Sequence, residues 1–395
     1  MVWAIHDRIS LVQNQILSVL PKMETITQNL LFPIPDYIYR MFKKRLAGVD
    51  LFRGIAAYMV ILLHSRNEAI VAPGFWTTQV LIFASFAVPF FFAASFYFTV
   101  ERLSRTGEPI ALKDKVYRLI IPYGFWSLVY VLARSFIYFK SGDTSGLTSL
   151  AQSYLSIIFT GSAAVHLYFL PILLVGLCLA KLLEALVIQR KSIKLLSILL
   201  FISLLLYSGL IHSGNGYKVG RFAFASLLEN MPSVFQNNPL VQFPLTFFAW
   251  GIQCFPYVMM AMVLTHSKVH STIVTPHYKR ARLLGIIGLF LILPFIQTMP
   301  PGLDELSMGY IALILAIQLS YHLPENVVLF NLGLCSFGIY LSHHLFVEIL
   351  EIGLAKINPI FLEKGSLAAV LTIATMSFLL GWMLTYGYQR IKRSS

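Results

Sequence analysis

The chain has 395 residues, of which 57% are hydrophobic and only 12% are charged, and its mean hydropathy is +0.74. This composition excludes an ordinary soluble domain and predicts a polytopic membrane protein. The formal net charge is +13, but the bases occupy short segments between apolar runs, which is typical of membrane topology and argues against nucleic acid as a partner. Cys178, Cys254 and Cys335 lie in apolar runs without CxxC or histidine spacing, so we expect neither a disulfide nor a metal site.

Residues 1–47 precede the first apolar run. Their apolar residues are spaced and interrupted by polar ones, which does not fit a signal peptide. An interfacial amphipathic helix and a disordered tail fit the pattern equally well. The cluster Lys43, Lys44 and Arg45 then precedes the first span in the manner of a cytoplasmic anchor.

The first span, GVDLFRGIAAYMVILLHSR from residue 48, carries ionisable groups inside an apolar stretch of membrane length. Arg53 and His64 are separated by about three helical turns, or about 16 Å, so a helix would present both on one face. Asp50 lies one turn before Arg53 and can pair with it. Intramembrane ionisable residues are functional candidates by default. The alternative is that the arginine extends to the interface and the histidine bonds a neighbouring helix without a catalytic role.

Apolar stretches of about 20 residues predict ten helical spans, at 48–68, 75–100, 119–139, 164–188, 195–212, 243–265, 283–299, 305–321, 333–352 and 366–388. Alternate connections carry the excess of lysine and arginine, which places both termini in the cytoplasm. We therefore predict an all-α polytopic membrane protein. It divides into a cytoplasmic or interfacial segment 1–47, a membrane domain 48–390 and a basic cytoplasmic tail 391–395. We see no internal repeat and no pair of Gly- or Pro-broken spans, which weakens a transporter interpretation.

The predicted orientation puts Arg53 near the inner surface and His64 beyond the bilayer midplane. A guanidinium suits a phosphate-bearing or pantetheine-bearing donor, and an imidazole suits proton transfer near neutral pH. Lys115 and Arg118 join the second and third spans and lie three residues apart, on one helix face. They are candidates for anion binding at the membrane surface, and ordinary topology anchoring explains them equally well.

The segment VDLFRGIAAYMVILLH resembles the first-span signature of the family-3 membrane acyltransferases, in which an arginine is followed by ten residues and a histidine. Arg53 and His64 match that spacing. Lys115-Val-Tyr-Arg118 before Ile-Ile-Pro resembles the family's second basic motif, with lysine in place of the first arginine.

Two later segments extend the resemblance. VHLYFLPILL around His166 and FGIYLSHHLF around His343 are similar to further family segments. One departure is Phe96, which stands where the family usually has a glycine, so that we expect either the packing of the second span or the access beside Ser95 to differ from the family pattern.

The resemblance implies an integral membrane O-acyltransferase that transfers groups other than aminoacyl groups, in the simplest case an O-acetyltransferase of the bacterial inner membrane. Its donor substrate is cytoplasmic acyl-CoA, such as acetyl-CoA, and no cofactor is expected to be bound permanently. Its acceptor is a hydroxyl of an exported or lipid-linked glycan, of the kind found in exopolysaccharides and O-antigens. The oligomeric state is not predicted.

On this hypothesis His64 removes the acceptor proton, and Arg53 together with Asp50 orients the thioester. Lys115 and Arg118 hold the phosphates of CoA. An acylated His64 is the alternative to direct transfer.

His166, His343 and Glu348 are candidate substrate-binding residues. An interfacial residue that contacts nothing reactive explains His166 equally well, and a hydrogen-bonded core histidine explains His343 equally well. A solvated helix end explains Glu348 and Glu351. Because His343 and His344 are adjacent, we expect only one of them, His343 by preference, to face His64.

Two other functions remain open. In a transporter or flippase of a glycan or lipid, Arg53 and His64 would line a translocation path. In a scaffold homologue that has lost activity, the substitution at Phe96 would be one sign of the loss.

Overall fold

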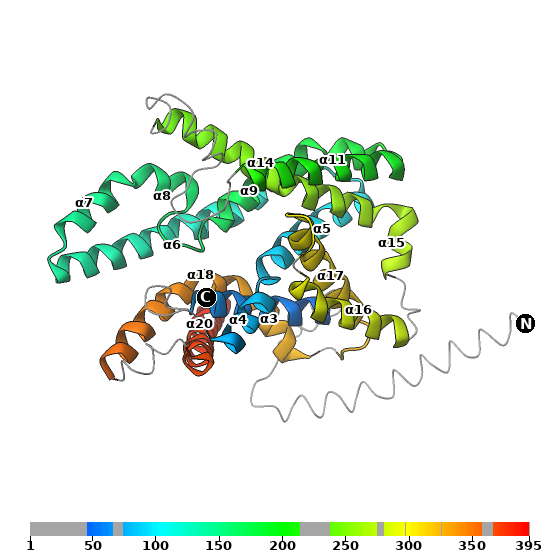
Figure 1. The fold of residues 1–395 in the computed structure, drawn as a ribbon. Helices are drawn as coiled ribbons and strands as arrows, with labels where there is room; N and C mark the ends of the chain where they lie inside the picture. Colours follow the sequence, from blue (N-terminus) through cyan, green and yellow to red (C-terminus); the bar gives the residue numbers. More distant parts are fainter. Residues whose placement is uncertain are drawn as a thin grey trace, which may run out of the picture. The chain divides into compact units, whose positions relative to one another are not determined.

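The computed structural model of the protein describes residues 46–65, 74–213, 238–274, 280–296, 298–324, 326–357 and 366–394. Helices make up most of these ranges, and no strand occurs in them (Figure 1). From residue 47 onward they belong to one unit, Ala47–Ser395. The predictions for residues 1–45 lie outside the described residues.

The helices of the first half are α3 (Ala47–His64), α4 (Phe75–Ala84), α5 (Ala87–Thr106), α6 (Leu112–Ser141), α7 (Thr144–Gln152), α8 (Tyr154–Thr160), α9 (Phe169–Leu182), α10 (Glu184–Ile188) and α11 (Ile193–His212). Those of the second half are α14 (Pro239–Thr265), α15 (Ser267–Val274), α16 (Arg280–Ile292), the short 3₁₀ helix η1 (Leu293–Phe295), α17 (Leu303–Leu319), α18 (Val327–Ile357) and α20 (Leu367–Ser394).

Within the described ranges, seven helical stretches are long and apolar enough to cross a membrane: Ala47–His64, Phe75–Thr106, Leu112–Ser141, Ile193–His212, Pro239–Thr265, Val327–Ile357 and Leu367–Ile391. Phe169–Leu182 and Ala281–Phe295 are shorter apolar helices. The prediction of an all-helical, multi-pass membrane protein is confirmed. Each predicted span overlaps a helix, but the count of ten spans and the cytoplasmic position of the termini stay predictions.

Two of the predicted spans differ from the helices in a way that proline explains. The span expected at 75–100 is broken after α4, and α5 begins at Ala87 with Pro89 in its first turn. The span expected from 164 begins only at Phe169, with Pro171 in the first turn of α9. Proline lacks a backbone N–H and is therefore favoured in the first turn of a helix, where that donor has no partner. As a result, His166 lies in a turn and not inside a helix.

Helix α3 packs along α18 and also contacts α17, α20 and α5. Two glycines make this close approach possible. A Cβ added at Gly48 would lie 2.1 Å from the carbonyl oxygen of Ala316, and one added at Gly333 would lie 2.1 Å from Oδ1 of Asp50. Small residues let membrane helices approach closely enough for their backbones and short side chains to contact. The beginning of α3 is thereby held against α17 and α18.

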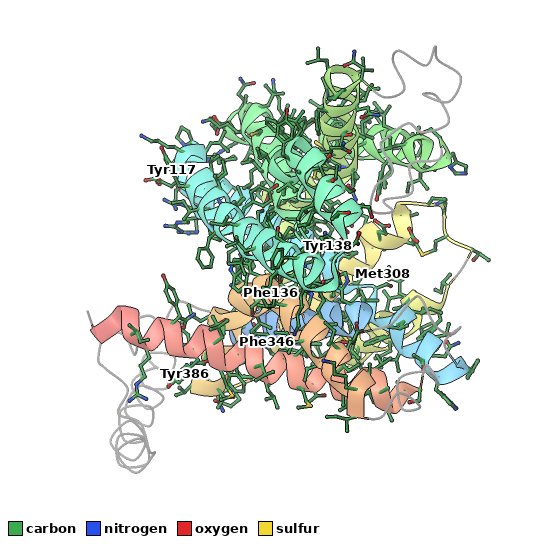
Figure 2. The ribbon with its side chains drawn as sticks, turned by 90° about the vertical axis from the view of Figure 1, so that its left-hand side faces the viewer. Tyr117, Phe136, Tyr138, Met308, Phe346 and Tyr386 are labelled. Carbon is green, nitrogen blue, oxygen red and sulfur yellow. The ribbon has the colours of Figure 1, made fainter. Side chains whose placement is uncertain are left out.

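Helix α6 is the most exposed of the membrane-length helices, since only 11% of its apolar window is buried. Figure 2 shows α6 passing over α18, with Phe136 and Tyr138 on α6 and Phe346 on α18. Most of the apolar surface of α6 is therefore exposed, while its second half borders α18.

Phe96 stands where the resembling family usually has glycine, and α9 accommodates its ring. The ring is fully buried, and a Cβ added at Gly176 of α9 would lie 2.3 Å from Cζ of Phe96. Where the family usually has a glycine, α5 thus carries Phe96, and the facing position on α9 is a glycine, Gly176. The ring of Phe96 fills the space beside this glycine, so Phe96 has a packing role.

We expect Gly176→Ala to destabilise the protein by about 1–3 kcal/mol, because the new methyl group overlaps the Phe96 ring in a packed interior. Thermal unfolding of the purified full-length protein in detergent measures the effect. Combining Gly176→Ala with Phe96→Ala should give a loss smaller than the sum of the two single losses, since the residues touch. Gly209→Ala is the control, because open space surrounds that glycine. An equal effect at Gly209 would contradict this packing account.

Candidate active site

Four histidine side chains meet at the end of α3, and we call them the histidine cluster. His64 is the last residue of α3, His166 precedes α9, and the adjacent His343 and His344 belong to α18. The ring centroid of His64 lies 5.4 Å from that of His343 and 5.7 Å from that of His344. The ring centroid of His166 lies 6.3 Å from that of His64 and 4.5 Å from that of His343. Residues far apart in the sequence therefore form one group.

The expectation that only one of the two adjacent histidines would face His64 was wrong. Neighbouring residues on a helix point about 100° apart, but each imidazole extends far enough from the backbone to reach the ring of His64 from its own side. The ring of His64 lies at nearly the same distance from both. His344, which the sequence analysis set aside, is consequently a member of the cluster.

Backbone carbonyls of α18 orient two of the imidazoles. Nε2 of His166 lies 3.3 Å from the carbonyl oxygen of Leu341, and Nδ1 of His343 lies 2.6 Å from that of Tyr340. A carbonyl only accepts hydrogen bonds, so these nitrogens carry the hydrogen. The other nitrogens, Nδ1 of His166 and Nε2 of His343, are buried and have no hydrogen-bond partner among the described residues. Each ring thus presents an acceptor nitrogen inside the cluster.

Tyr130 and Tyr340 support the cluster, and sequence reasoning missed both. The Tyr130 hydroxyl donates to the carbonyl oxygen of Leu341 at 2.9 Å and accepts from the backbone N–H of Leu345 at 3.3 Å. It therefore bridges two backbone groups that are paired in a regular helix. The Tyr340 hydroxyl donates to the carbonyl oxygen of His166. Together these bonds tie α6 and the turn before α9 to the histidine-bearing turn of α18.

A carboxylate on the same face of α18 as His344 contacts the cluster. Nδ1 of His344 lies 3.1 Å from Oε1 of Glu348, one helical turn away. The Glu348 side chain is 27% exposed, so it is more enclosed than a solvated helix end. Among the described residues, no group of three or more His, Cys, Asp or Glu side chains is arranged to hold a metal ion.

The other charged residues of α3 lie toward its beginning. Helix α3 is continuous from Ala47 to His64, so Arg53 and His64 lie on one helix, as the spacing argument requires. Asp50 is buried, and its Oδ1 lies 3.9 Å from a guanidinium nitrogen of Arg53. The Arg53 side chain is 36% exposed, so the guanidinium remains accessible.

Lys115 and Arg118 both lie in α6 but in different surroundings. The ammonium group of Lys115 is half-buried and donates to the hydroxyl of Thr99 on α5 at 2.9 Å. Arg118 is exposed. The pair is therefore not two equivalent surface cations, because one charge is fixed against α5 while the other extends outward.

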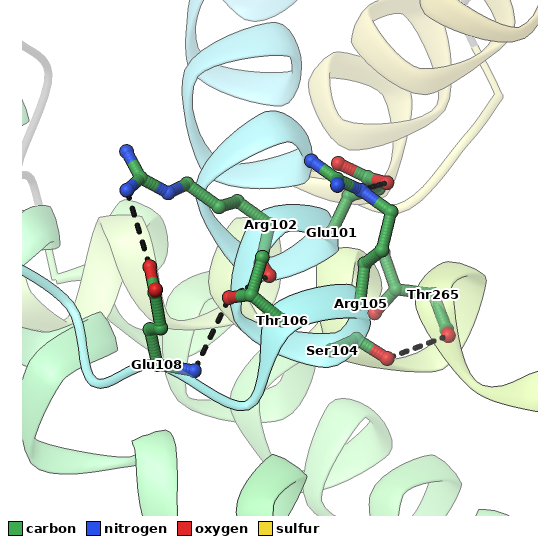
Figure 3. A network of polar contacts seen from close by, with 7 residues as sticks. All are labelled: Glu101, Arg102, Ser104, Arg105, Thr106, Glu108 and Thr265. Atoms are coloured by element: carbon green, nitrogen blue, oxygen red, sulfur yellow. Dashed lines mark hydrogen bonds and ion pairs between the residues drawn. The ribbon is translucent and has the colours of Figure 1, made fainter.

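The connection into α6 is fixed by polar contacts on both sides. At the end of α5, Arg102 pairs with Glu108 at 3.3 Å and Arg105 pairs with Glu101 at 3.0 Å (Figure 3). Beyond it, the backbone N–H of residue 110 donates to Oε2 of Glu184 at 2.9 Å. Burial acts against ionisation of Glu184, but the hydrogen bonds from Lys181 and from this amide lower the pKa of its carboxyl group. These contacts position the turn that precedes Lys115.

A model of a known protein family matches most of the chain. The helices define an integral, multi-pass membrane protein, and a family model described as an acyltransferase domain matches residues 46–386. The chain belongs to the family-3 acyltransferases and is an acyltransferase.

Curated relatives share a part of the chain only. Two amino-acid racemases of Enterococcus faecalis are each 32% identical to it, over 156 and 145 residues, or 39% and 36% of this chain. The matched stretch covers 20% of each racemase. No solved structure matches.

Tyr130→Phe should lower the stability of the protein by about 1 kcal/mol, because it removes the hydroxyl that satisfies two buried backbone groups of α18. Thermal unfolding in detergent checks this value. Tyr117→Phe, at an exposed position of the same helix, is the matched control and should leave the midpoint unchanged. Equal midpoints for the wild type and Tyr130→Phe would show that the bridging hydroxyl is not important for stability.

Proposed function

We propose that this membrane acyltransferase is an O-acetyltransferase that uses cytoplasmic acyl-CoA, in the simplest case acetyl-CoA. Its acceptor is a hydroxyl of an exported or lipid-linked glycan. The observation that carries the proposal is the position of His64, at the end of the helix that also bears Arg53 and inside a cluster of histidines. In the reaction, the acceptor oxygen attacks the thioester carbonyl carbon and the C–S bond breaks. The hydroxyl proton ends on the thiol of CoA.

His64 acts as the base that removes the acceptor proton. A general base must lie within hydrogen-bond reach of the proton it takes and contributes about 10²–10⁴-fold to the rate. The ring of His64 adjoins His343, whose Nε2 has no partner among the described residues. His166 and His343 shape the space around the reacting hydroxyl.

Arg53 and Asp50 orient the thioester end of the donor, while Lys115 and Arg118 bind the phosphates of CoA. A guanidinium presents two parallel N–H donors to a phosphate or a carbonyl oxygen. The Asp50 carboxylate, 3.9 Å from a guanidinium nitrogen, orients the Arg53 side chain. The bond from Lys115 to Thr99 supports a fixed phosphate contact at the beginning of α6.

Two chemical routes fit the arrangement. In the direct route, the acceptor attacks the thioester of CoA. In the covalent route, His64 first takes the acyl group and the acceptor then attacks acyl-His64. Acid quenching of the enzyme with labelled acetyl-CoA, followed by peptide mass analysis, separates the routes through label on His64.

The cellular setting is part of the same proposal. The protein lies in a bacterial inner membrane with both termini in the cytoplasm, takes its donor from that side, and uses neither nucleic acid nor a permanently bound cofactor. The lipid bilayer is its immediate environment.

His64→Ala should lower acyl transfer by at least about 100-fold, because it removes the base. The measurement uses purified full-length protein, [14C]acetyl-CoA and membranes that supply the acceptor, and counts alkali-labile label. His212→Ala is the matched control, since His212 is an exposed histidine on α11 whose Nδ1 lies 2.8 Å from the carbonyl oxygen of Ser208. Turnover by His64→Ala at the wild-type rate, with folding retained, would refute the assigned role.

Replacing Lys115 and Arg118 together by glutamine should weaken CoA binding by at least about tenfold, because a hydrogen bond between charged groups is worth about 1.5–3 kcal/mol. Calorimetric titration of the detergent-solubilised protein with CoA measures the change. The control replaces two exposed lysines, Lys113 and Lys191, and removes the same charge. If both double variants bind CoA as the wild type does, Lys115 and Arg118 are topology anchors.

A further inference from the structure

A cleft opens where the second half of α6 borders α18, close to the histidine cluster. Its volume is about 380 Å³, within the range of small-ligand sites, about 300–1,000 Å³. The lining residues are Arg134, Ile137 and Tyr138 of α6 and Glu348, Glu351 and Ile352 of α18. We call it the α6–α18 cleft. Figure 2 shows Tyr138 on the stretch of α6 that forms one wall.

One residue connects this cleft to the histidine cluster. Glu348 lines the cleft, and its Oε1 lies 3.1 Å from Nδ1 of His344. The ring centroid of His344 lies in turn 5.7 Å from that of His64. A ligand bound in the cleft would therefore be separated from the proposed base by the His344 side chain.

The polar groups of the cleft require a ligand that both donates and accepts hydrogen bonds. Oε1 of Glu351 is buried and has no hydrogen-bond partner in the described part of the chain. Leaving a buried carboxylate oxygen without a donor is costly. Arg134 faces the same cleft with donors only, and one of its guanidinium nitrogens lies 3.5 Å from the carbonyl oxygen of Ser162.

These charges favour a neutral polyol over an ion. Two carboxylates repel an anion, and a cation offers no acceptor for the guanidinium donors of Arg134. A sugar ring satisfies both sides, because its hydroxyls donate to carboxylates while its hydroxyl and ring oxygens accept from a guanidinium. Ile137 and Ile352 add apolar walls suited to the C–H groups of the ring.

We propose that the α6–α18 cleft binds a sugar ring of the acceptor. Glu348 and Glu351 accept hydrogen bonds from its hydroxyls, and Arg134 donates to its oxygens. This assignment rests on the proposed function, because it names the acceptor site of the same reaction. The bound ring delivers a neighbouring hydroxyl past His344 to His64, which removes its proton as the oxygen attacks the acyl carbon.

The test fills the cleft with a larger side chain. Ile352→Trp places an indole on the wall of the cleft, and Ile349→Trp places the same group elsewhere on α18. Both isoleucines are exposed, at 49% and 55%, and only Ile352 lines the cleft. Membrane vesicles that contain each variant in place of the wild-type protein are supplied with [14C]acetyl-CoA. The readouts are alkali-labile label and, separately, the affinity of the purified variant for CoA.

We expect Ile352→Trp to lower transfer at least tenfold and to leave CoA affinity within twofold of the wild type, while Ile349→Trp transfers normally. Transfer by Ile352→Trp at the wild-type rate would overturn the proposal. An equal loss in Ile349→Trp would overturn it as well, because the effect would then be unrelated to the cleft.

A second variant decides the case if Ile352→Trp fails to fold and loses CoA binding. Glu351→Gln keeps the size of the side chain and replaces the carboxylate, so it should lower transfer at least fivefold at unchanged CoA affinity. Glu101→Gln, in the ion pair with Arg105 on α5, is its control. Normal transfer by Glu351→Gln would overturn the proposal. A wild-type protein that transfers no label would instead refute the proposed function, which keeps the two failures distinct.

Discussion

The close packing of α3 against α18 is the contact on which the site depends. Gly333 leaves room for the buried Asp50 side chain, and Gly54 faces the side chain of Leu332. Water supplies no driving force inside a bilayer, so membrane helices associate through the close fit that small residues allow. A wider separation of α3 and α18 would move His64 away from His343 and His344. The geometry of the proposed chemistry therefore depends on glycines that take no part in it.

The histidine cluster also shows how polar groups are kept in an apolar surrounding. Backbone carbonyls of α18 take up one nitrogen each of His166 and His343, and the Tyr130 hydroxyl bridges two backbone groups of the same helix. An unsatisfied polar atom is expensive at membrane depth. The atoms of these rings that lack a partner among the described residues are Nε2 of His343 and Nδ1 of His166.

Sequence periodicity was sufficient for features that lie within one helix. The positions of Arg53 and His64 on α3 follow from their spacing, and the apolar stretches located helices at all the predicted spans. Features that depend on how helices pack against one another could not be predicted from periodicity. Only the three-dimensional structure shows that His166 contacts α18 and that His344 belongs to the cluster. The same is true of the contact between Phe96 and Gly176. Tyr130 gave no signal, because a tyrosine in an apolar span is common.

Helix α6 carries residues proposed to bind the donor and residues proposed to bind the acceptor. It begins near Lys115, contacts the histidine-bearing turn of α18 through Tyr130 and then lines the cleft with Arg134. The distance along the helix from Lys115 to Tyr130 is about 22 Å. A helix of this length behaves as a rod, and α6 is continuous from Leu112 to Ser141 although Pro122 removes one of its backbone hydrogen bonds. A tilt of the donor end of α6 would therefore be transmitted as a displacement of the turn that carries His343 and His344.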